Sequence, residues 1–154
     1  MNSRWLHCEL PREEASLRLF CFPHAGGGPQ AHRGWSEALQ AVLAETHVVG
    51  DWAVEVSGPP CVHVYDTNVL ACDVGAPQVV SVSLPGRGVR FNEEYKFDSV
   101  RDLAVKICDE IETLCTLLPY VFFGHSFGAL LAYEVPFFSS GAFRRHALST
   151  RALL

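Results

Sequence analysis

The chain has 154 residues, of which 49% are hydrophobic, and this length can bury one sizeable core, so we expect one domain over residues 1–154. The net charge is −5, and lysine and arginine form no run or stripe, which argues against nucleic acid and against an anionic membrane surface as partners. No apolar run is long enough to cross a bilayer, and residues 1–14 are too polar for a secretory signal, so the sequence predicts a cytoplasmic protein.

The first predicted strand covers residues 17–22 and ends at Pro23, where a glycine-rich turn follows. An amphipathic helix then begins near Trp35, with apolar residues at helical spacing. The glycines do not form the dinucleotide fingerprint. They would let backbone N–H groups approach a substrate oxygen, as one half of an oxyanion hole, but the residues alone are equally consistent with a flexible turn.

The second predicted strand, residues 78–84, ends in a tight loop with the sequence Pro-Gly-Arg-Gly at residues 85–88. Open α/β sheets place their ligands at such carboxyl ends. Arg87 could orient an anionic group of a substrate or a carrier. Because surface arginines more often bind carboxylates of their own chain, we expect Arg87 instead to anchor the loop to a neighbouring carboxylate.

The clearest helix follows, with Asp98 or Ser99 as its cap and a capping-box pattern from Ser99 to Asp102. One apolar stripe runs along it. The stripe contains Val100, Leu103, Ala104, Ile107, Ile111, Leu114 and Leu118.

Six cysteines are scattered over the chain without a C-x-x-C pair, and the seven histidines show no ligand spacing. We predict no metal site, and we interpret most of the cysteines as small buried hydrophobic residues. Cys108 and Cys115 lie seven residues apart on the expected inner face of the same helix, which favours packing over metal binding.

The most informative motif is G-x-S-x-G at residues 124–128, with Ser126 at its centre. Residues 119–123 form an aromatic and β-branched strand before it, and residues 129–135 form a helical run after it. A sharp turn from strand to helix lifts a serine hydroxyl clear of its neighbours, and the flanking small residues Gly124 and Gly128 let strand and helix pack closely. Five-residue patterns also occur by chance, but this context favours a nucleophile elbow. The order of strands and helices predicts an α/β fold with a mostly parallel, doubly wound sheet.

Four sequence blocks now stand in order along the chain: F-P-H-A-G-G at residues 22–27, W-S-E-A-L at 35–39, L-P-G-R-G at 84–88 and G-H-S-F-G at 124–128. Together they resemble the N-terminal half of a type II thioesterase. This α/β-hydrolase family includes fatty-acid-synthase (oleoyl-ACP) hydrolases and the editing thioesterases of polyketide and nonribosomal peptide synthetases. The resemblance covers about residues 17–40 and 79–135. Another serine esterase is a less favoured alternative because the L-P-G-R-G block is more selective than the elbow motif.

The resemblance implies that Ser126 attacks an acyl thioester on an acyl carrier protein and forms an acyl-enzyme, without a cofactor. It implies that the oxyanion is held by the backbone N–H of Phe127 and by one from the turn around Ala25. His125 would face away from the nucleophile in a packing or hydrogen-bonding role, and His24 would shape the oxyanion turn.

Two segments depart from the family pattern. Residues 40–78 form an atypical insertion, for which we consider either a retained exon or a lid. Pro136 is expected to interrupt the helix after the elbow, and the tail from residue 136 no longer resembles the family.

In α/β-hydrolases the acid and the base of the triad follow the serine on later strands, which we do not find in this sequence. His146 is a poor substitute because no strand is evident to present it. The alternative function is therefore an inactive, truncated chain that at most binds a carrier or an acyl chain. We also expect the strand before Ser126 to lie near an unpaired sheet edge, with apolar surface left uncovered.

Overall fold

The computed structural model describes residues 3–15, 17–45, 77–114, 118, 120–138 and 147–153. Most of the predicted insertion, and all of residues 139–146 with His146, lie outside the described residues. The strands are β1 (Leu6–His7), β2 (Arg18–Phe22), β3 (Gln78–Val82), β4 (Tyr120–His125) and β5 (Ala147–Leu153). The helices are α1 (Trp35–Glu45), α3 (Val100–Leu114) and α4 (Phe127–Phe138), with the short 3-10 turns η1 (Pro29–His32) and η2 (Gly88–Arg90).

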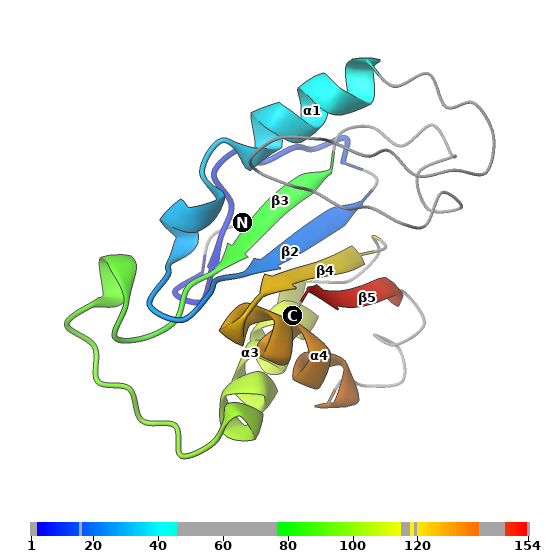
Figure 1. Cartoon of the computed structure of the whole chain (residues 1–154). Coiled ribbons are helices and arrows are strands. Elements are labelled where there is room, and N and C mark those ends of the chain that lie inside the picture. Colours follow the sequence, from blue (N-terminus) through cyan, green and yellow to red (C-terminus); the bar gives the residue numbers. More distant parts are fainter. Residues whose placement is uncertain are drawn as a thin grey trace.

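The five strands form one sheet in the order β1-β3-β2-β4-β5 (Figure 1). β2 pairs in parallel with both β3 and β4, and β1 alone runs antiparallel, against β3. Helices cover both faces, with α1 on one side and α3 and α4 on the other (Figure 1). The predicted α/β fold with a mostly parallel sheet is confirmed.

Successive side chains along each strand point to opposite faces of the sheet, so the buried ones form two hydrophobic clusters. On the α3 and α4 side, Phe20, Phe22 and Phe122 are fully buried and meet edge to face, with ring centroids 5.8 Å and 5.3 Å apart. On the α1 side, Cys21 and Val79 pack with Trp35 in a smaller cluster. The larger core therefore lies under α3 and α4.

α3 begins as its sequence predicts. Ser99 Oγ accepts a hydrogen bond from the Asp102 N–H at 3.1 Å and donates one to the Asp102 carboxylate at 2.6 Å. From the predicted apolar stripe, Leu103, Ile107 and Ile111 are fully buried.

Two expectations about the C-terminal part were wrong. β5 pairs in parallel with β4 from Tyr120 to His125, so β4 is an interior strand. The backbone of β4 can accept this neighbour although the residues of β5 lack the β-branched, alternating pattern of a strand. α4 continues to Phe138, two residues beyond Pro136, because a proline in the last turn removes only one hydrogen bond before the helix ends.

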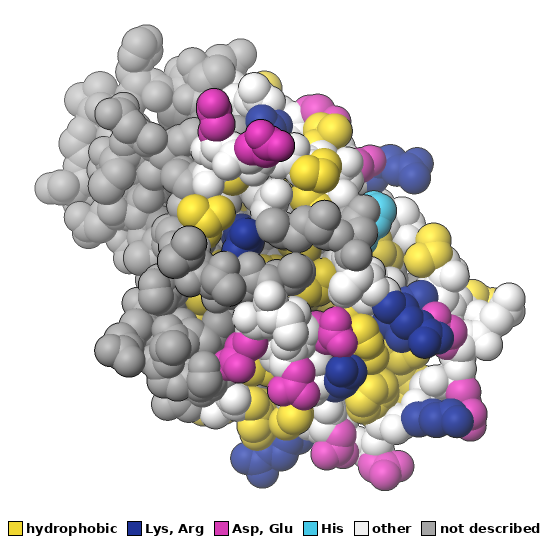
Figure 2. Space-filling view, turned by 180° about the vertical axis from the view of Figure 1, so that it is seen from behind, with side chains coloured by type: hydrophobic (Ala, Val, Ile, Leu, Met, Phe, Trp, Pro, Cys, Tyr) yellow, Lys and Arg dark blue, Asp and Glu magenta, His cyan; other side chains and the backbone are white. Residues whose placement is uncertain are grey.

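Apolar side chains are exposed on α4 instead of at an edge beside β4. Leu130, Tyr133 and Phe137 are exposed at helical spacing, and the rings of Tyr133 and Phe137 lie 5.1 Å apart. On the face of the molecule that Figure 2 shows, apolar side chains reach the surface among interspersed acidic and basic ones. No helix in the described ranges has the length and apolar character that a membrane span needs.

The topology positions two loops side by side. β2 and β4 are neighbours, but the chain leaves β2 toward α1 and leaves β4 into α4 on the opposite face (Figure 1). A crevice opens at the carboxyl ends of parallel strands where connections diverge in this way. The glycine-rich turn after β2 and Ser126 after β4 both lie at this point.

Candidate active site

Ser126 sits in a strained backbone conformation between strand and helix. Its φ is +55°, and it is the only non-glycine residue with positive φ in the part of the chain that the structure describes. β4 ends at His125 and α4 begins at Phe127, and the Ser126 carbonyl accepts the N–H of Ala129 at 2.9 Å. Ser126 is exposed to solvent, as a residue with an attacking hydroxyl must be. The predicted strand–turn–helix geometry is therefore present.

The two glycines of the motif hold strand and helix in direct contact. A Cβ added at Gly124 would overlap the carbonyl oxygen of Gly128. A Cβ added at Gly128 would overlap the carbonyl oxygen of Phe22 and lie 2.8 Å from that of Pro23. The second contact also joins the elbow to the end of β2, where the glycine-rich turn begins.

That turn has a compact shape of its own. The Gly27 N–H donates to the His24 carbonyl at 2.9 Å, and a Cβ at Gly27 would lie 2.9 Å from the His24 ring. Ala25 is exposed, and Gly26 has a φ of +81°. His24 thus shapes the turn, as expected, and the turn starts beside the elbow.

The loop of residues 85–88 lies against the first residue of α4. Arg87 lies between two glycines of positive φ, Gly86 at +73° and Gly88 at +52°. Its guanidinium carbon stands 5.2 Å from the ring centroid of Phe127. The side chain of Gln30 lies against both Gly28 and Gly88, so it packs between the two glycine loops.

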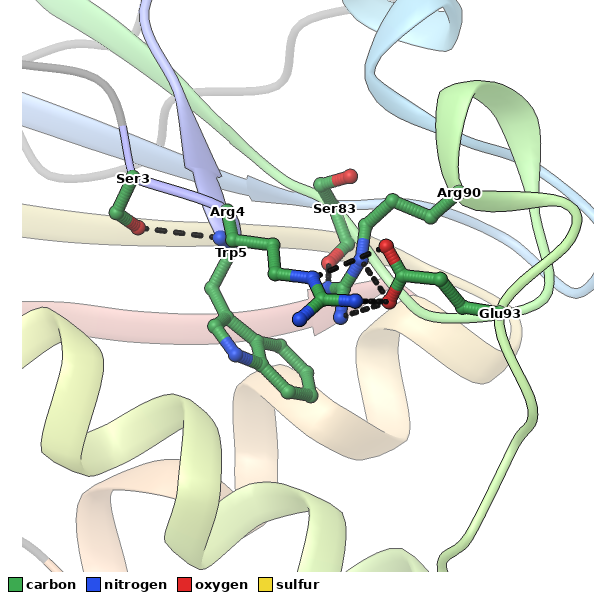
Figure 3. A network of polar contacts seen from close by, with 6 residues as sticks. All are labelled: Ser3, Arg4, Trp5, Ser83, Arg90 and Glu93. Carbon is green, nitrogen blue, oxygen red and sulfur yellow. Dashed lines mark hydrogen bonds and ion pairs between the residues drawn. The ribbon is translucent and has the colours of Figure 1, made fainter.

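A different arginine anchors this loop, which corrects our expectation for Arg87. The Arg90 guanidinium donates to the Ser83 carbonyl at 2.6 Å, pairs with Glu93 at 2.7 Å and stacks over Trp5 at 4.3 Å (Figure 3). Arg4 shares the same carboxylate at 3.0 Å. The hydrogen bond from Arg90, followed by that from Arg4, lowers the pKa of Glu93 to about 2. Sequence reasoning missed this pair, although the spacing of Arg90 and Glu93, three residues apart, is a signal that could have found it.

Within the described residues, no hydrogen bond joins the Ser126 hydroxyl to a histidine. His125 is exposed rather than packed. His32, which sequence reasoning missed, is buried on the α1 side and shares a hydrogen bond with Ser81 Oγ at 3.2 Å. Burial, with a smaller contribution from His24, lowers the pKa of His32 to about 4. No periodicity marks His32 in the sequence, because one histidine in a short turn has no pattern.

A cleft of about 360 Å³ lies elsewhere, between η1 and the β1–β3 edge of the sheet, and neither Ser126 nor Phe127 lines it. The cysteines in the described ranges, Cys8, Cys21 and Cys108, are buried and form no disulfide, as the sequence predicts for small hydrophobic residues. Burial raises the pKa of Cys108 to about 12, so this thiol is no nucleophile at neutral pH.

Comparisons with known proteins agree on one family. The family profile described as "Thioesterase domain" matches residues 69–136. The gramicidin S biosynthesis protein GrsT of Aneurinibacillus migulanus is 27% identical over 86% of this chain and 38% of its own length. The medium-chain S-acyl fatty acid synthase thioesterase of Homo sapiens is 25% identical over 86% of this chain and 37% of its own length.

A solved thioesterase structure is also similar to this chain. RedJ, the thioesterase of the prodiginine pathway in Streptomyces coelicolor, is 37% identical, with a TM-score of 0.53 over 85% of this chain and 36% of its own. The chain thus spans less than two fifths of the length of each of these relatives. With its elbow, two glycine loops and mostly parallel sheet, the chain is similar to the N-terminal part of type II thioesterases, which are α/β-hydrolases.

Proposed function

We propose that this chain provides the nucleophilic half of a thioesterase that hydrolyses acyl thioesters. The observation that carries the proposal is the strained, exposed Ser126 between β4 and α4. In the proposed reaction Ser126 Oγ attacks the thioester carbonyl, and a tetrahedral oxyanion forms. The carbon–sulfur bond then breaks, the thiolate leaves, and water hydrolyses the acyl-serine ester to a free acid.

The oxyanion is proposed to bind two backbone N–H groups, those of Phe127 and Ala25. Phe127 is the first residue of α4, where N–H groups have no partner inside the helix and the helix dipole favours negative charge. The close contact of Gly128 with Phe22 and Pro23 supports the second donor, because it brings the turn that holds Ala25 to the elbow. Gly124, His125 and Gly128 would serve as the frame of the nucleophile.

The proposed partner is the acyl carrier of a fatty acid, polyketide or nonribosomal peptide synthase, in the cytoplasm, and no cofactor takes part. Support comes from the relatives, whose names place them in gramicidin S biosynthesis and fatty acid synthesis. The thiol of a carrier is a good leaving group, so catalysis depends mainly on activating the serine and binding the oxyanion.

A second function, acyl or carrier binding without turnover, is favoured by one observation. The serine proton needs an acceptor, and no histidine contacts Ser126 in the described ranges. His146 is outside them, so its candidacy as a base stays a prediction.

A fluorophosphonate probe tests the nucleophile, because it reacts with an activated serine beside an oxyanion site. We expect labelling at Ser126, its loss in Ser126→Ala, and its persistence in the control Ser99→Ala, which removes an exposed serine from the cap of α3. Release of thiol from an acyl thioester in the same samples separates the two functions. Labelling with turnover supports the thioesterase, and labelling without turnover supports the binder. Absence of labelling would contradict an activated serine.

A further inference from the structure

The cleft of about 360 Å³ between η1 and the β1–β3 edge takes no part in the proposed reaction, because neither Ser126 nor Phe127 lines it. A cavity of this volume can hold a small molecule. A sheet face beneath a helical layer ordinarily buries apolar side chains, but the buried floor of this cleft is mostly polar. The floor consists of His32, Ser36, Val79, Ser81 and Ser83. Such a floor suits a ligand that forms hydrogen bonds.

One hydroxyl of the floor has no partner among the described residues. Ser83 is 3% exposed, and its Oγ is buried without a hydrogen bond. Figure 3 shows this hydroxyl on the side away from the Arg90 guanidinium, which binds the Ser83 carbonyl instead. Two positions earlier, Ser81 Oγ shares a hydrogen bond with His32, which burial keeps uncharged at neutral pH by lowering its pKa to about 4. The floor is therefore uncharged and holds a hydroxyl that a ligand can bind.

The walls of the cleft are positively charged, although the chain as a whole is negative. Arg4 and Arg90 both pair with one carboxylate, that of Glu93. On the η1 side, Arg33 Nε lies 3.8 Å from Glu9 Oε1, which is longer than a hydrogen bond. The other Glu9 oxygen accepts a backbone N–H at 3.3 Å. Three guanidiniums thus meet two carboxylates, which leaves a positive charge here in a chain whose net charge is −5.

These groups decide which class of ligand fits. In the described part of the chain no three potential metal ligands stand together, and the surplus charge disfavours any cation. A purely apolar ligand would leave the floor hydroxyls unpaired. An anion with several oxygens can accept from the floor and from the walls at once. A phosphate group offers its oxygens in tetrahedral directions, whereas a carboxylate offers two in one plane.

We propose that this cleft binds the phosphate group of a small phosphate monoester, with the Arg33 guanidinium and the Ser83 hydroxyl as donors, at a site separate from Ser126. A phosphate monoester carries nearly two negative charges at neutral pH. Arg90 and Glu93 hold the Ser83 end of the cleft in place, so little order has to be gained on binding. Two sources supply this chemistry, a free phosphorylated metabolite and the phosphopantetheine arm of a carrier.

Calorimetric titration of the full chain at pH 7.5 tests the site with three probes, inorganic phosphate, 4′-phosphopantetheine and pantetheine. We expect both phosphate compounds to bind saturably and pantetheine, which lacks the phosphate, not to bind. Arg33→Gln should weaken phosphate binding about tenfold or more, and Ser83→Ala several-fold, because each removes a donor to a charged group. Equal affinity for the two phosphate compounds assigns the site to the phosphate group alone. Tighter binding of 4′-phosphopantetheine assigns it to the arm of a carrier.

Arg101→Gln is the matched control, because Arg101 is an exposed arginine on α3 that does not line the cleft. It should bind both phosphate compounds like the parent chain. Fluorophosphonate labelling of Ser126 should be the same in Arg33→Gln as in the parent, since the two sites are separate. Thermal melts identify a variant that fails to fold, and the exposed position of Arg33 lets Arg33→Gln carry the test if Ser83→Ala does so.

Three results would overturn the proposal. The first is that neither phosphate compound binds. The second is that binding survives either cleft substitution in a folded protein, which would indicate an adventitious ion only. The third is an equal loss in Arg101→Gln, which would indicate a general effect of charge. None of these results bears on the nucleophile, which the labelling of Ser126 tests by itself.

Discussion

At the scale of single residues, His32 shows how burial sets protonation. The His32 ring lies edge to face against the rings of Trp35 and Phe123, with centroids 5.0 Å and 6.2 Å away. Its Nδ1 shares a hydrogen bond with Ser81 Oγ. The neutral imidazole fits this apolar environment, whereas the imidazolium would lose its water. The low pKa of His32, about 4, is therefore linked to the stability of the α1 side of the sheet.

The first prediction concerns the pH dependence of stability. The pKa of His32 is lowered from 6.5 to about 4, so the unfolded chain binds the proton more tightly than the folded one. Stability is then fully present above pH 6.5 and is lost as the pH falls toward 4, by about 3 kcal/mol in total. Urea unfolding between pH 7 and 4.5 should show this loss.

Variants identify the group responsible. His32→Gln should flatten the slope in that range, while His7→Gln, at an exposed position, should leave it unchanged. An unchanged slope in His32→Gln would contradict the assignment. Glu93 does not interfere, because its pKa is lowered from 4.5 to about 2, so its contribution is lost only below pH 4.5.

The residue scale also shows where sequence reasoning stops. Both Arg87 and Arg90 stand in one loop, and the sequence alone favoured Arg87 as the partner of a carboxylate. The fold decides otherwise, because Arg90 lies over Trp5 and beside the end of β3, within reach of Glu93. Which of two nearby arginines meets a carboxylate depends on the path of the backbone in space.

At the scale of elements, the elbow could be predicted well because its causes are local. A strand-forming run, a serine between glycines and a helix-forming run determine it within about a dozen residues. The end of α4 was harder to predict. The sequence shows that Pro136 is unfavourable in a helix, but it does not show that α4 gains two more residues before it ends.

The second prediction compares alanine substitutions at glycines with different constraints. Gly128→Ala places a Cβ against the backbone of Phe22 and Pro23, where no side chain can move away, and should cost about 2–3 kcal/mol. Gly26→Ala meets no atom within 4 Å and carries only the strain of a φ of +81°, which costs about 1 kcal/mol.

Chemical denaturation measures both variants, and the fluorophosphonate reaction reports on the site. Gly128→Ala should also slow labelling of Ser126, since strand and helix must separate. Equal stability of the two variants would show that the close approach at Gly128 is not a constraint.

At the scale of the whole molecule, β5 is the part that the sequence least revealed. Residues 147–153 contain Ala, Leu, Ser, Thr and Arg without alternation, so nothing in them predicts a strand. Their structure follows from the neighbouring strand β4, whose backbone offers a ladder of hydrogen-bonding groups. Local patterns predict local elements, and a pairing across the sheet is not local.

The third prediction tests this pairing. Thr150 lies opposite Phe122, and Thr150→Pro removes a donor from the strand and disfavours its regular pairing. We expect a loss of about 2 kcal/mol or more and a larger aggregated fraction in size-exclusion chromatography, because β4 would become an open edge. Thr150→Val keeps the N–H and suits a strand, so it should behave like the parent. A Thr150→Pro chain that melts and elutes like the parent would mean that β5 does not protect β4.

The Arg90 cluster has a consequence for how the chain is handled in experiments. Trp5 and Arg4 belong to the N-terminal segment, and through Arg90 and Glu93 they hold the loop after β3 (Figure 3). A fusion partner or a deletion that displaces residues 3–5 would therefore loosen the loop after β3, whereas the close contacts of Gly124 and Gly128 around Ser126 would stay intact. Tagged and tag-free preparations of this protein should differ in thermal stability before they differ in reactivity toward the serine probe.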